Sequence, residues 1–141
     1  MKICVIDGQG GGIGATIIKK IKEQYSENLE IIALGTNAIA TSQMLKSRAN
    51  RGASGENAIV QTVAHVDVII GTIAIVLAHG MMGEMTPLMT EAIASSPARK
   101  IIIPLSQENV QIVGAPAIPL PRLVDQLIND YLSTSFEATH K

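Results

Sequence analysis

The sequence predicts a three-layer α/β domain in which helices cover both faces of a mostly parallel sheet of four to five strands. Apolar runs rich in branched residues alternate along the 141 residues with segments of helical periodicity. Five glycines stand among residues 8–14, directly between the first apolar run and the first helical segment. Charged residues make up only 16 % of the chain, as expected where both faces of a sheet are covered.

The length of the chain fits one domain, which should bury about two-thirds of the surface that its unfolded form exposes. No internal repeat or shift of composition marks a second boundary. We therefore place a single domain at residues 1–132 and expect residues 133–141 to form a polar, solvated tail.

The first third of the sequence predicts a βαβ unit. Residues 3–6 form a continuous apolar run, which is typical of a strand buried on both faces. Apolar residues then recur at helical spacing from Ile13 to Ile21, with lysines on the opposite face. A second strand follows at residues 30–34 and ends at Gly35. The spacing of about 30 residues indicates a parallel pair with a right-handed crossover.

The middle of the chain predicts two more helices and a third strand. The helices are expected at residues 36–47 and 56–65, with a loop at residues 48–55 between them. A strand is expected at residues 66–70. The segment at residues 73–78 is apolar on every side, and we interpret it as a buried helical turn rather than as an extension of the strand.

The last part of the chain predicts a fourth core strand between two helices. Thr86 followed by proline is a typical cap and first helical position, and this helix should end near Pro97. The fourth strand is expected at residues 100–105, and a short edge strand at residues 111–113. Three prolines then lead into an amphipathic helix at residues 123–132.

Composition excludes several classes of function. The net charge is −1, and the chain has only two tyrosines and one phenylalanine, so it offers neither a basic field nor stacking platforms for nucleic acid. The lone cysteine, Cys4, lies in an apolar run and is interpreted as a small buried hydrophobe. No signal peptide or membrane span is expected, so we predict a cytoplasmic protein.

The glycine-rich stretch matches two forms of a nucleotide-binding turn. Gly10, Gly12 and Ala15 fit the GxGxxA fingerprint, in which small residues allow a tight turn and a close approach of phosphate. Gly8, Gly12 and Gly14, with the ending Gly-Ile-Gly, resemble the GxxxGxG loop of short-chain dehydrogenases. Both fits predict a Rossmann-like domain with a phosphate at this turn. The alternative is that the glycines only let helix and strand pack closely.

The resemblance to dehydrogenases does not extend to their catalytic residues. Those enzymes carry a tyrosine and a lysine four residues apart, whereas neither Tyr25 nor Tyr131 has a lysine at that spacing. The sequence therefore leaves enzymatic activity and any catalytic residue undetermined.

The end of the second strand also departs from the usual pattern for NAD. An acidic residue is expected there to bind the ribose, but residues 35–37 are Gly-Thr-Asn. Thr36, Asn37 and Ser42, with Arg48 or Arg51, could instead donate hydrogen bonds to a 2′-phosphate. This pattern favours NADP over NAD. The alternative is a helix cap with solvated arginines.

Taken as a whole, the chain resembles a family of short, uncharacterised bacterial Rossmann-like proteins of unknown function. The resemblance rests on the phrases Val-Ile-Asp-Gly-Gln-Gly-Gly-Gly-Ile-Gly at residues 5–14 and Ala-Leu-Gly-Thr-Asn at residues 33–37. Further matching phrases occupy residues 49–53, 55–58, 83–84 and 86–87. The resemblance reaches nearly to the carboxyl-terminal helix, and it implies a fold without an activity.

Two further places could contact a ligand. Asp7 should face the crevice at the carboxyl ends of the strands, where it would contact a ribose or a cation, or instead accept amides of its own glycine turn. The loop from Arg51 to Asn57 combines a guanidinium, Ser54 and a helix start, which favour an anion, although a capped helix with an exposed arginine explains it equally well.

A group of methionines follows the third predicted strand. A soft metal could use Met81, Met82 and Met85 with His79, but methionines here are more typical of core or subunit-interface packing, and we predict no metal site. His79 and Glu84 form the one acid/base pair expected near the crevice.

These observations leave three hypotheses for function. The first is a sensor or carrier that binds a nucleotide, with NADP or NAD as its ligand. The second is an oxidoreductase subunit that needs a partner, and the third is a structural homo-oligomer with a vestigial site. The residues expected to bind the nucleotide are Asp7, Gly8, Gln9, Gly10, Gly11, Gly12, Ile13, Gly14, Gly35, Thr36, Asn37, Arg51, Ser54, Gly71 and Thr72.

Overall fold

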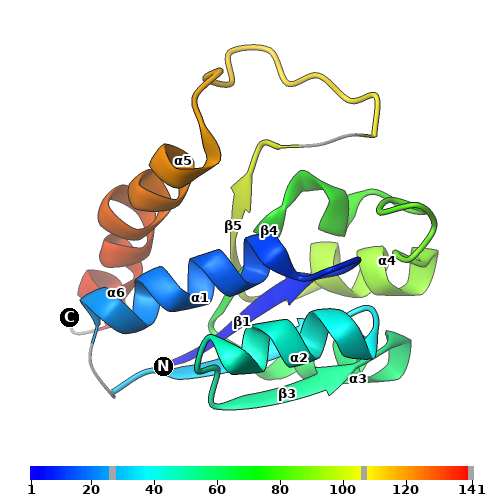
Figure 1. Ribbon diagram of the computed structural model, residues 1–141, viewed down its shortest axis with the longest axis horizontal. Helices are drawn as coiled ribbons and strands as arrows, with labels where there is room; N and C mark the ends of the chain where they lie inside the picture. Colours follow the sequence, from blue (N-terminus) through cyan, green and yellow to red (C-terminus); the bar gives the residue numbers. More distant parts are fainter. Residues whose placement is uncertain (26–27, 106–107, 140–141) are drawn as a thin grey trace.

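Five parallel strands form a single sheet in the computed structural model of the protein, which describes residues 1–25, 28–105 and 108–139. The strand order is β3-β2-β1-β4-β5 (Figure 1). The predicted α/β class and the predicted parallel sheet are therefore confirmed. The strands are β1 (Lys2–Asp7), β2 (Glu30–Gly35), β3 (Arg51–Ser54), β4 (Val68–Thr72) and β5 (Arg99–Ile103).

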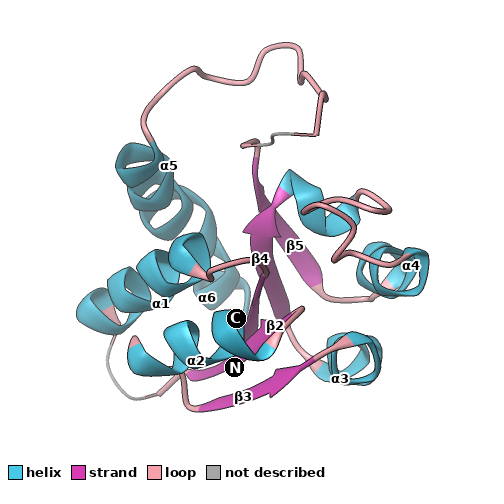
Figure 2. Ribbon diagram, turned by 45° about the vertical axis from the view of Figure 1, so that its right-hand side comes forward, coloured by secondary structure: helices cyan, strands magenta, loops and turns pink. Residues whose placement is uncertain are grey.

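Helices cover both faces of this sheet, which gives the three layers that the sequence predicts (Figure 2). One face carries α1 (Gly12–Gln24), α2 (Ala38–Lys46), α5 (Leu120–Gln126) and the π-helical turn η3 (Leu127–Leu132). The other face carries α3 (Glu56–Thr62), α4 (Pro87–Ser95) and the 3₁₀ turns η1 (Val63–His65) and η2 (Ile73–Val76). Among the described helices, none is both long and apolar enough to cross a lipid bilayer.

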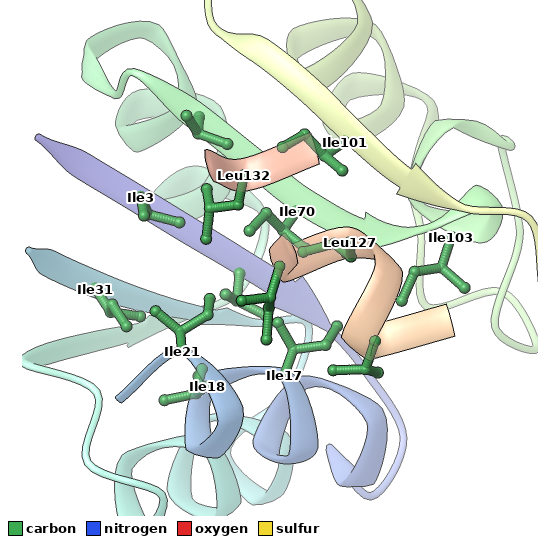
Figure 3. Packing of buried hydrophobic residues seen from close by; sticks show 14 of the residues in the cluster. Ile3, Ile17, Ile18, Ile21, Ile31, Ile70, Ile101, Ile103, Leu127 and Leu132 are labelled. Atoms are coloured by element: carbon green, nitrogen blue, oxygen red, sulfur yellow. The ribbon is translucent and has the colours of Figure 1, made fainter. Parts of the chain in front are cut away.

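The first strand is buried on both faces, which explains its uninterrupted apolar sequence. Ile3 and Val5 belong to the cluster under α1, and Cys4 and Ile6 belong to the cluster on the opposite face. Side chains from α1 and η3 pack against the sheet in the first cluster (Figure 3). Cys4 is fully buried, and this burial raises the pKa of its thiol to about 12, so the predicted role as a small hydrophobe is confirmed.

The strand order fixes where a crevice can form. From β1 the chain builds β2 and β3 in one direction, and then crosses back through α3 to place β4 on the other side of β1. The loops after β1 and β4 therefore diverge to opposite faces of the sheet. In open parallel sheets, this reversal is the point at which ligands bind, outside the carboxyl ends of the strands.

Two local predictions in the middle of the chain are confirmed. Residues 73–76 form the buried turn η2 instead of extending β4. The hydroxyl of Thr86 accepts a hydrogen bond from the amide of Met89 at 3.3 Å, and Pro87 occupies the first position of α4. Both features follow from local chemistry, because a cap and a proline act on the residues next to them.

The predicted loop at residues 48–55 is wrong, because it contains β3. This strand pairs with residues 32–35 of β2. Its four residues, Arg-Gly-Ala-Ser, have little intrinsic preference for a strand. They are extended because β2 presents an open edge beside them, and this is information that a local sequence pattern does not contain.

The predicted edge strand at residues 111–113 is also wrong. The described residues 108–119 form an extended loop, in which Val113 is 99 % exposed. The branched residues favour a strand locally, but this segment pairs with no strand of the described chain. Without a neighbour to complete its hydrogen bonds, the extended segment remains a loop.

The predicted solvated tail is helical instead. After η3 the chain continues as α6 (Ser133–Thr139), while residues 140–141 of that prediction lie outside the described part of the chain. Phe136 packs against Tyr25, with the ring centroids 4.7 Å apart. The guanidinium of Arg99 donates to the Tyr131 carbonyl oxygen at 2.9 Å and also to the hydroxyls of Thr134 and Ser135. These contacts attach α6 to the sheet and to α1.

Truncating Phe136 should therefore destabilise the protein. We expect Phe136→Ala to lower the free energy of unfolding by about 1–3 kcal/mol, since it removes an aromatic side chain that packs against the core. The control is Leu88→Ala, because Leu88 is 58 % exposed and its truncation should change stability by less than about 0.5 kcal/mol. Urea denaturation measures both values, and an equally small effect at Phe136 would contradict the packing of α6.

Candidate functional site

The carboxyl ends of four strands bring most of the predicted site residues to one edge of the sheet. Asp7 ends β1 and stands beside Gly35 of β2 in the register of the sheet. Ser54 ends β3 beside Gly35, and Thr72 ends β4. This edge of the sheet is therefore the candidate site.

The carboxylate of Asp7 closes the glycine turn. Its Oδ1 accepts a hydrogen bond from the amide of Gly8 at 2.8 Å, and its Oδ2 accepts one from the amide of Gly14 at 2.7 Å. Burial raises the pKa of Asp7, while the hydrogen bonds from Gly14 and Gly8 act in the opposite direction. Of the two roles that the sequence left open, the structure confirms the one in which Asp7 accepts amides of its own turn.

Three glycines of the turn are required by the fold. Gly11 caps α1 with a φ of 74°, a backbone conformation that favours glycine, and a Cβ there would lie 2.7 Å from the backbone of Ala40. At Gly14 a Cβ would lie 2.6 Å from the sulfur of Met44. At Gly8 it would lie 2.5 Å from the hydroxyl oxygen of Thr36. Close packing thus accounts for these three positions.

Gly10 and Gly12 have no such explanation within the chain. Apart from the adjacent residues and the backbone of α1 itself, a Cβ at either position would meet no heavy atom of the described residues within 4 Å, and neither residue has a positive φ. Both glycines are exposed, whereas Gly8, Gly11 and Gly14 are buried. The fold would accept a side chain at these two positions. Because both are glycine, the space at the start of α1 stays open.

Backbone amides stand beside this open space. The amides of Gly11 and Gly14 donate to Gly8 and Asp7 within the turn. The amides of Gly12 and Ile13 have no hydrogen-bond acceptor among the described residues. They belong to the first turn of a 13-residue helix, where unpaired amides and the helix dipole favour an anion.

A carboxylate from a distant loop also reaches this edge. Glu84 lies in the segment 77–86 between η2 and α4, which we call the Glu84 loop. Its Oε1 accepts three hydrogen bonds: from the Gln9 amide at 2.8 Å, the Thr36 hydroxyl at 2.5 Å and the Asn37 side-chain amide at 2.9 Å. Partial burial raises the pKa of Glu84, but these hydrogen bonds outweigh it and hold the pKa below its usual value. Glu84 is therefore ionised at neutral pH.

The Glu84 loop has an unusual backbone. His79, Met81 and Met82 have positive φ values of 67°, 56° and 57°, a conformation that non-glycine residues adopt at an energetic cost. Hydrogen bonds hold this shape, among them one from the His79 amide to the Met85 carbonyl oxygen at 2.7 Å. A second runs from the Met81 amide to the Glu108 carboxylate at 2.7 Å.

The methionines of this loop serve mainly as core residues. Met81 and Met85 are buried in the cluster on the α4 face, which confirms packing as their role, while Met82 is 91 % exposed. Within the described ranges of the chain, no group of three or more His, Cys, Asp or Glu side chains could hold a metal ion. The hydrogen bonds of Glu84 go to Gln9, Thr36 and Asn37, and not to its predicted acid/base partner His79.

The residues predicted to receive a 2′-phosphate are only partly brought together. The Asn37 side-chain oxygen accepts from the Ala40 amide at 2.8 Å, so the helix-cap interpretation is confirmed. Arg51 is the first residue of β3 and so lies at the amino ends of the strands, opposite the glycine turn. Its guanidinium forms an ion pair with the carboxylate of Glu30 in β2 at 2.5 Å. The hydroxyl of Ser54 pairs with that of Thr41 at 2.7 Å. Arg51 is therefore placed away from the glycine turn.

Two hollows flank the glycine turn. The first is a cavity of about 290 Å³ at the point where the strand order reverses. Gly71 of β4, a predicted site residue beside this cavity, packs against the side chain of Ile75, so close packing accounts for this glycine. The second is a shallow hollow along the start of α2. The cavity is lined by Asp7, Gln9, Ile13, Thr72, Ala74, Met81, Met82, Leu105 and Glu108, and the shallow hollow by Gly10, Ala38, Ile39, Ser42, Gln43 and Lys46.

The sheet order, the three layers and the glycine turn together define a Rossmann-like α/β protein. Within this class the chain belongs to a family described as a domain of unknown function (DUF3842), whose match covers residues 2–135. No curated protein matches the chain. The resemblance to an uncharacterised family that the sequence suggests is thus confirmed.

Alanine substitutions should separate the glycines that the fold requires from those that it does not. We expect Gly14→Ala to lower the free energy of unfolding by about 1–3 kcal/mol, because the new Cβ overlaps the sulfur of Met44. Gly12→Ala should leave stability unchanged or raise it by up to about 1 kcal/mol, since it restricts only the unfolded chain. Thermal and urea denaturation measure both changes, and a large loss at Gly12 would contradict the open space beside it.

Asp7→Asn should destabilise the glycine turn. Both carboxylate oxygens of Asp7 accept amides, so an asparagine must direct its NH₂ group at one of these donors. We expect a loss of about 1–3 kcal/mol in the free energy of unfolding, the cost of an unsatisfied buried polar group. The matched control is Asp125→Asn on the exposed side of α5, which should have little effect. Equal stability of the two variants would refute this role of Asp7.

Proposed function

We propose that this protein binds a nucleotide through a phosphate placed at the start of α1, with an NAD(P)-type dinucleotide as its ligand. The observation that carries the proposal is the pair Gly10 and Gly12, which the packing of the chain does not require, beside the unpaired amides of Gly12 and Ile13. A phosphate oxygen would accept those amides and occupy the space that a side chain would otherwise fill.

The two hollows support a ligand with two parts. A pyrophosphate at the glycine turn would lie between the shallow hollow at α2 and the cavity beside β4. Dinucleotides bind Rossmann-like sheets in this way, with one nucleotide on each side of the reversal in strand order. This arrangement favours a dinucleotide over a mononucleotide.

The charge of the cavity beside β4 narrows what could enter it. Asp7 and Glu108 contribute carboxylates to its lining, and no lysine or arginine of the described residues lines it. A second phosphate would be repelled there, whereas a neutral or positively charged ring would be accepted. The nicotinamide end of a dinucleotide has this character.

We also infer a homo-oligomer in the cytoplasm. The one cysteine is a buried free thiol, which is compatible with a reducing compartment. Met82 and Val113 are almost fully exposed, and they are the residues that we expect at a contact between copies.

A thermal-shift panel tests nucleotide binding. The panel contains NAD(H), NADP(H), ADP, ATP, GTP, FAD and S-adenosylmethionine. A ligand present at 100 times its dissociation constant should stabilise the protein by about 2.7 kcal/mol. We expect the dinucleotides to give the largest shifts. A flat response to the whole panel would refute nucleotide binding and favour a structural role.

Gly12→Asp provides the test of location. Its carboxylate would stand where the phosphate is proposed, so the shift should be lost. Gln61→Glu adds the same charge on the exposed side of α3 and should keep the shift. Persistence of the shift in Gly12→Asp would place the ligand elsewhere. Consumption of NAD(P)H in the presence of a partner or substrate would instead identify an oxidoreductase.

A further inference from the structure

We propose that Glu84 is the ribose-binding carboxylate of this site, and that it selects nucleotides with a free 2′-hydroxyl, such as NAD, against their 2′-phosphorylated forms. The inference rests on the proposed nucleotide function, and it replaces the preference for NADP that the sequence indicates.

The position of Glu84 supports this role. Dinucleotide-binding sheets use an acidic residue at the end of the second strand to bind the ribose hydroxyls. In this chain β2 ends at Gly35 and is followed by two neutral residues, Thr36 and Asn37. The carboxylate of Glu84 nevertheless lies 2.5 Å from the Thr36 hydroxyl and 2.9 Å from the Asn37 side-chain amide. Tertiary folding thus brings a carboxylate to the end of β2, beside Asn37, which stands 47 residues earlier in the chain than Glu84.

Glu84 also touches the phosphate-binding turn. Its Oε1 accepts the Gln9 amide at 2.8 Å, and a Cβ placed on Gly8 would lie 2.8 Å from the same oxygen. One side-chain oxygen therefore stands between the end of β2 and the turn after β1. A ribose that connects a phosphate on this turn to a base over α2 must pass beside this carboxylate.

The second oxygen of the carboxylate is available to a ligand. All three hydrogen bonds of Glu84 end on Oε1, and Oε2 has no hydrogen-bond partner among the described residues. The side chain is partly exposed, so a ligand can reach it. The lone pairs of this oxygen could accept hydrogen bonds from the adjacent 2′- and 3′-hydroxyls of a ribose.

The charge at this position opposes a 2′-phosphate. The groups that hold Glu84 are an amide, a hydroxyl and a side-chain amide, and no cation of the described chain lies within 4 Å of the carboxylate. Its negative charge is therefore uncompensated and would repel a phosphate beside it.

Three of the donors that the sequence assigned to a 2′-phosphate are engaged elsewhere. Thr36 and Asn37 donate to Glu84, and Arg51 is paired with Glu30 at the other edge of the sheet. A 2′-phosphate beside Glu84 would therefore meet an uncompensated carboxylate, and the two donors next to it, Thr36 and Asn37, already donate to that carboxylate.

Glu84→Gln separates ribose binding from a purely structural role. The amide oxygen of glutamine can accept the same three hydrogen bonds as Oε1, so the Glu84 loop keeps its anchor. The variant loses the negative charge and presents an NH₂ group where Oε2 stood. The matched control is Glu91→Gln on the exposed side of α4, which makes the same chemical change away from the site.

The experiment measures dissociation constants of NADH and NADPH by fluorescence titration, and those of AMP and adenosine 2′,5′-bisphosphate by calorimetry. We expect the wild-type protein to bind NADH at least about tenfold more tightly than NADPH, with the same order for the adenosine pair. Glu84→Gln should reduce this ratio by about tenfold, with weaker NADH and stronger NADPH binding. Glu91→Gln should not change it. The melting temperature of each variant reports whether it is folded. The comparison of NADH with NADPH on the wild-type protein tests the inference without any variant.

Equal affinities for NADH and NADPH, or a ratio that Glu84→Gln leaves unchanged, would overturn the inference while leaving nucleotide binding in place. In that case Glu84 serves only to anchor its loop. Absence of binding for all four ligands would overturn the proposed function itself, and this inference with it.

Discussion

The hydrogen bonds of the Asp7 carboxylate to the amides of Gly8 and Gly14 are the interaction on which the rest of the site depends. They join the end of β1 to the second residue after the start of α1, and so fix the direction in which that helix leaves the sheet. They also pair two amides of the turn, while those of Gly12 and Ile13, in the first turn of α1, have no acceptor in the described chain. Burying a carboxylate is costly, and the raised pKa of Asp7 reflects that cost.

The pKa of a second carboxylate at the same edge of the sheet, that of Glu84, is shifted in the opposite direction. Glu84 is partly exposed, and three donors lower its pKa, so it stays ionised while Asp7 is penalised by burial. Through Gln9, Thr36 and Asn37 it ties together the loops that follow β1 and β2. The strained backbone of the Glu84 loop is held by these bonds and by the burial of Met81 and Met85. Two acidic side chains thus shape a site that we propose for a nucleotide.

Sequence reasoning predicted the features that local chemistry controls. The buried first strand follows from an uninterrupted apolar run, and the start of α4 from Thr86 and Pro87. It failed where a distant partner decides the structure. Residues 51–54 become a strand only because β2 lies beside them, and residues 111–113 do not because no strand of the described chain pairs with them. Likewise, the helix after η3 depends on Arg99 and Tyr25, which are remote in sequence.

The sequence by itself determined the fold class and the glycine turn, because strand periodicity, helix capping and glycine spacing act over a few neighbouring residues. Only the tertiary structure divided the glycines into those that packing requires and the two that it leaves open. It also placed Arg51 at the far edge of the sheet and brought Glu84 to the end of β2. The physical reason is that packing and charge act through space, so residues distant in the chain decide which groups surround the site.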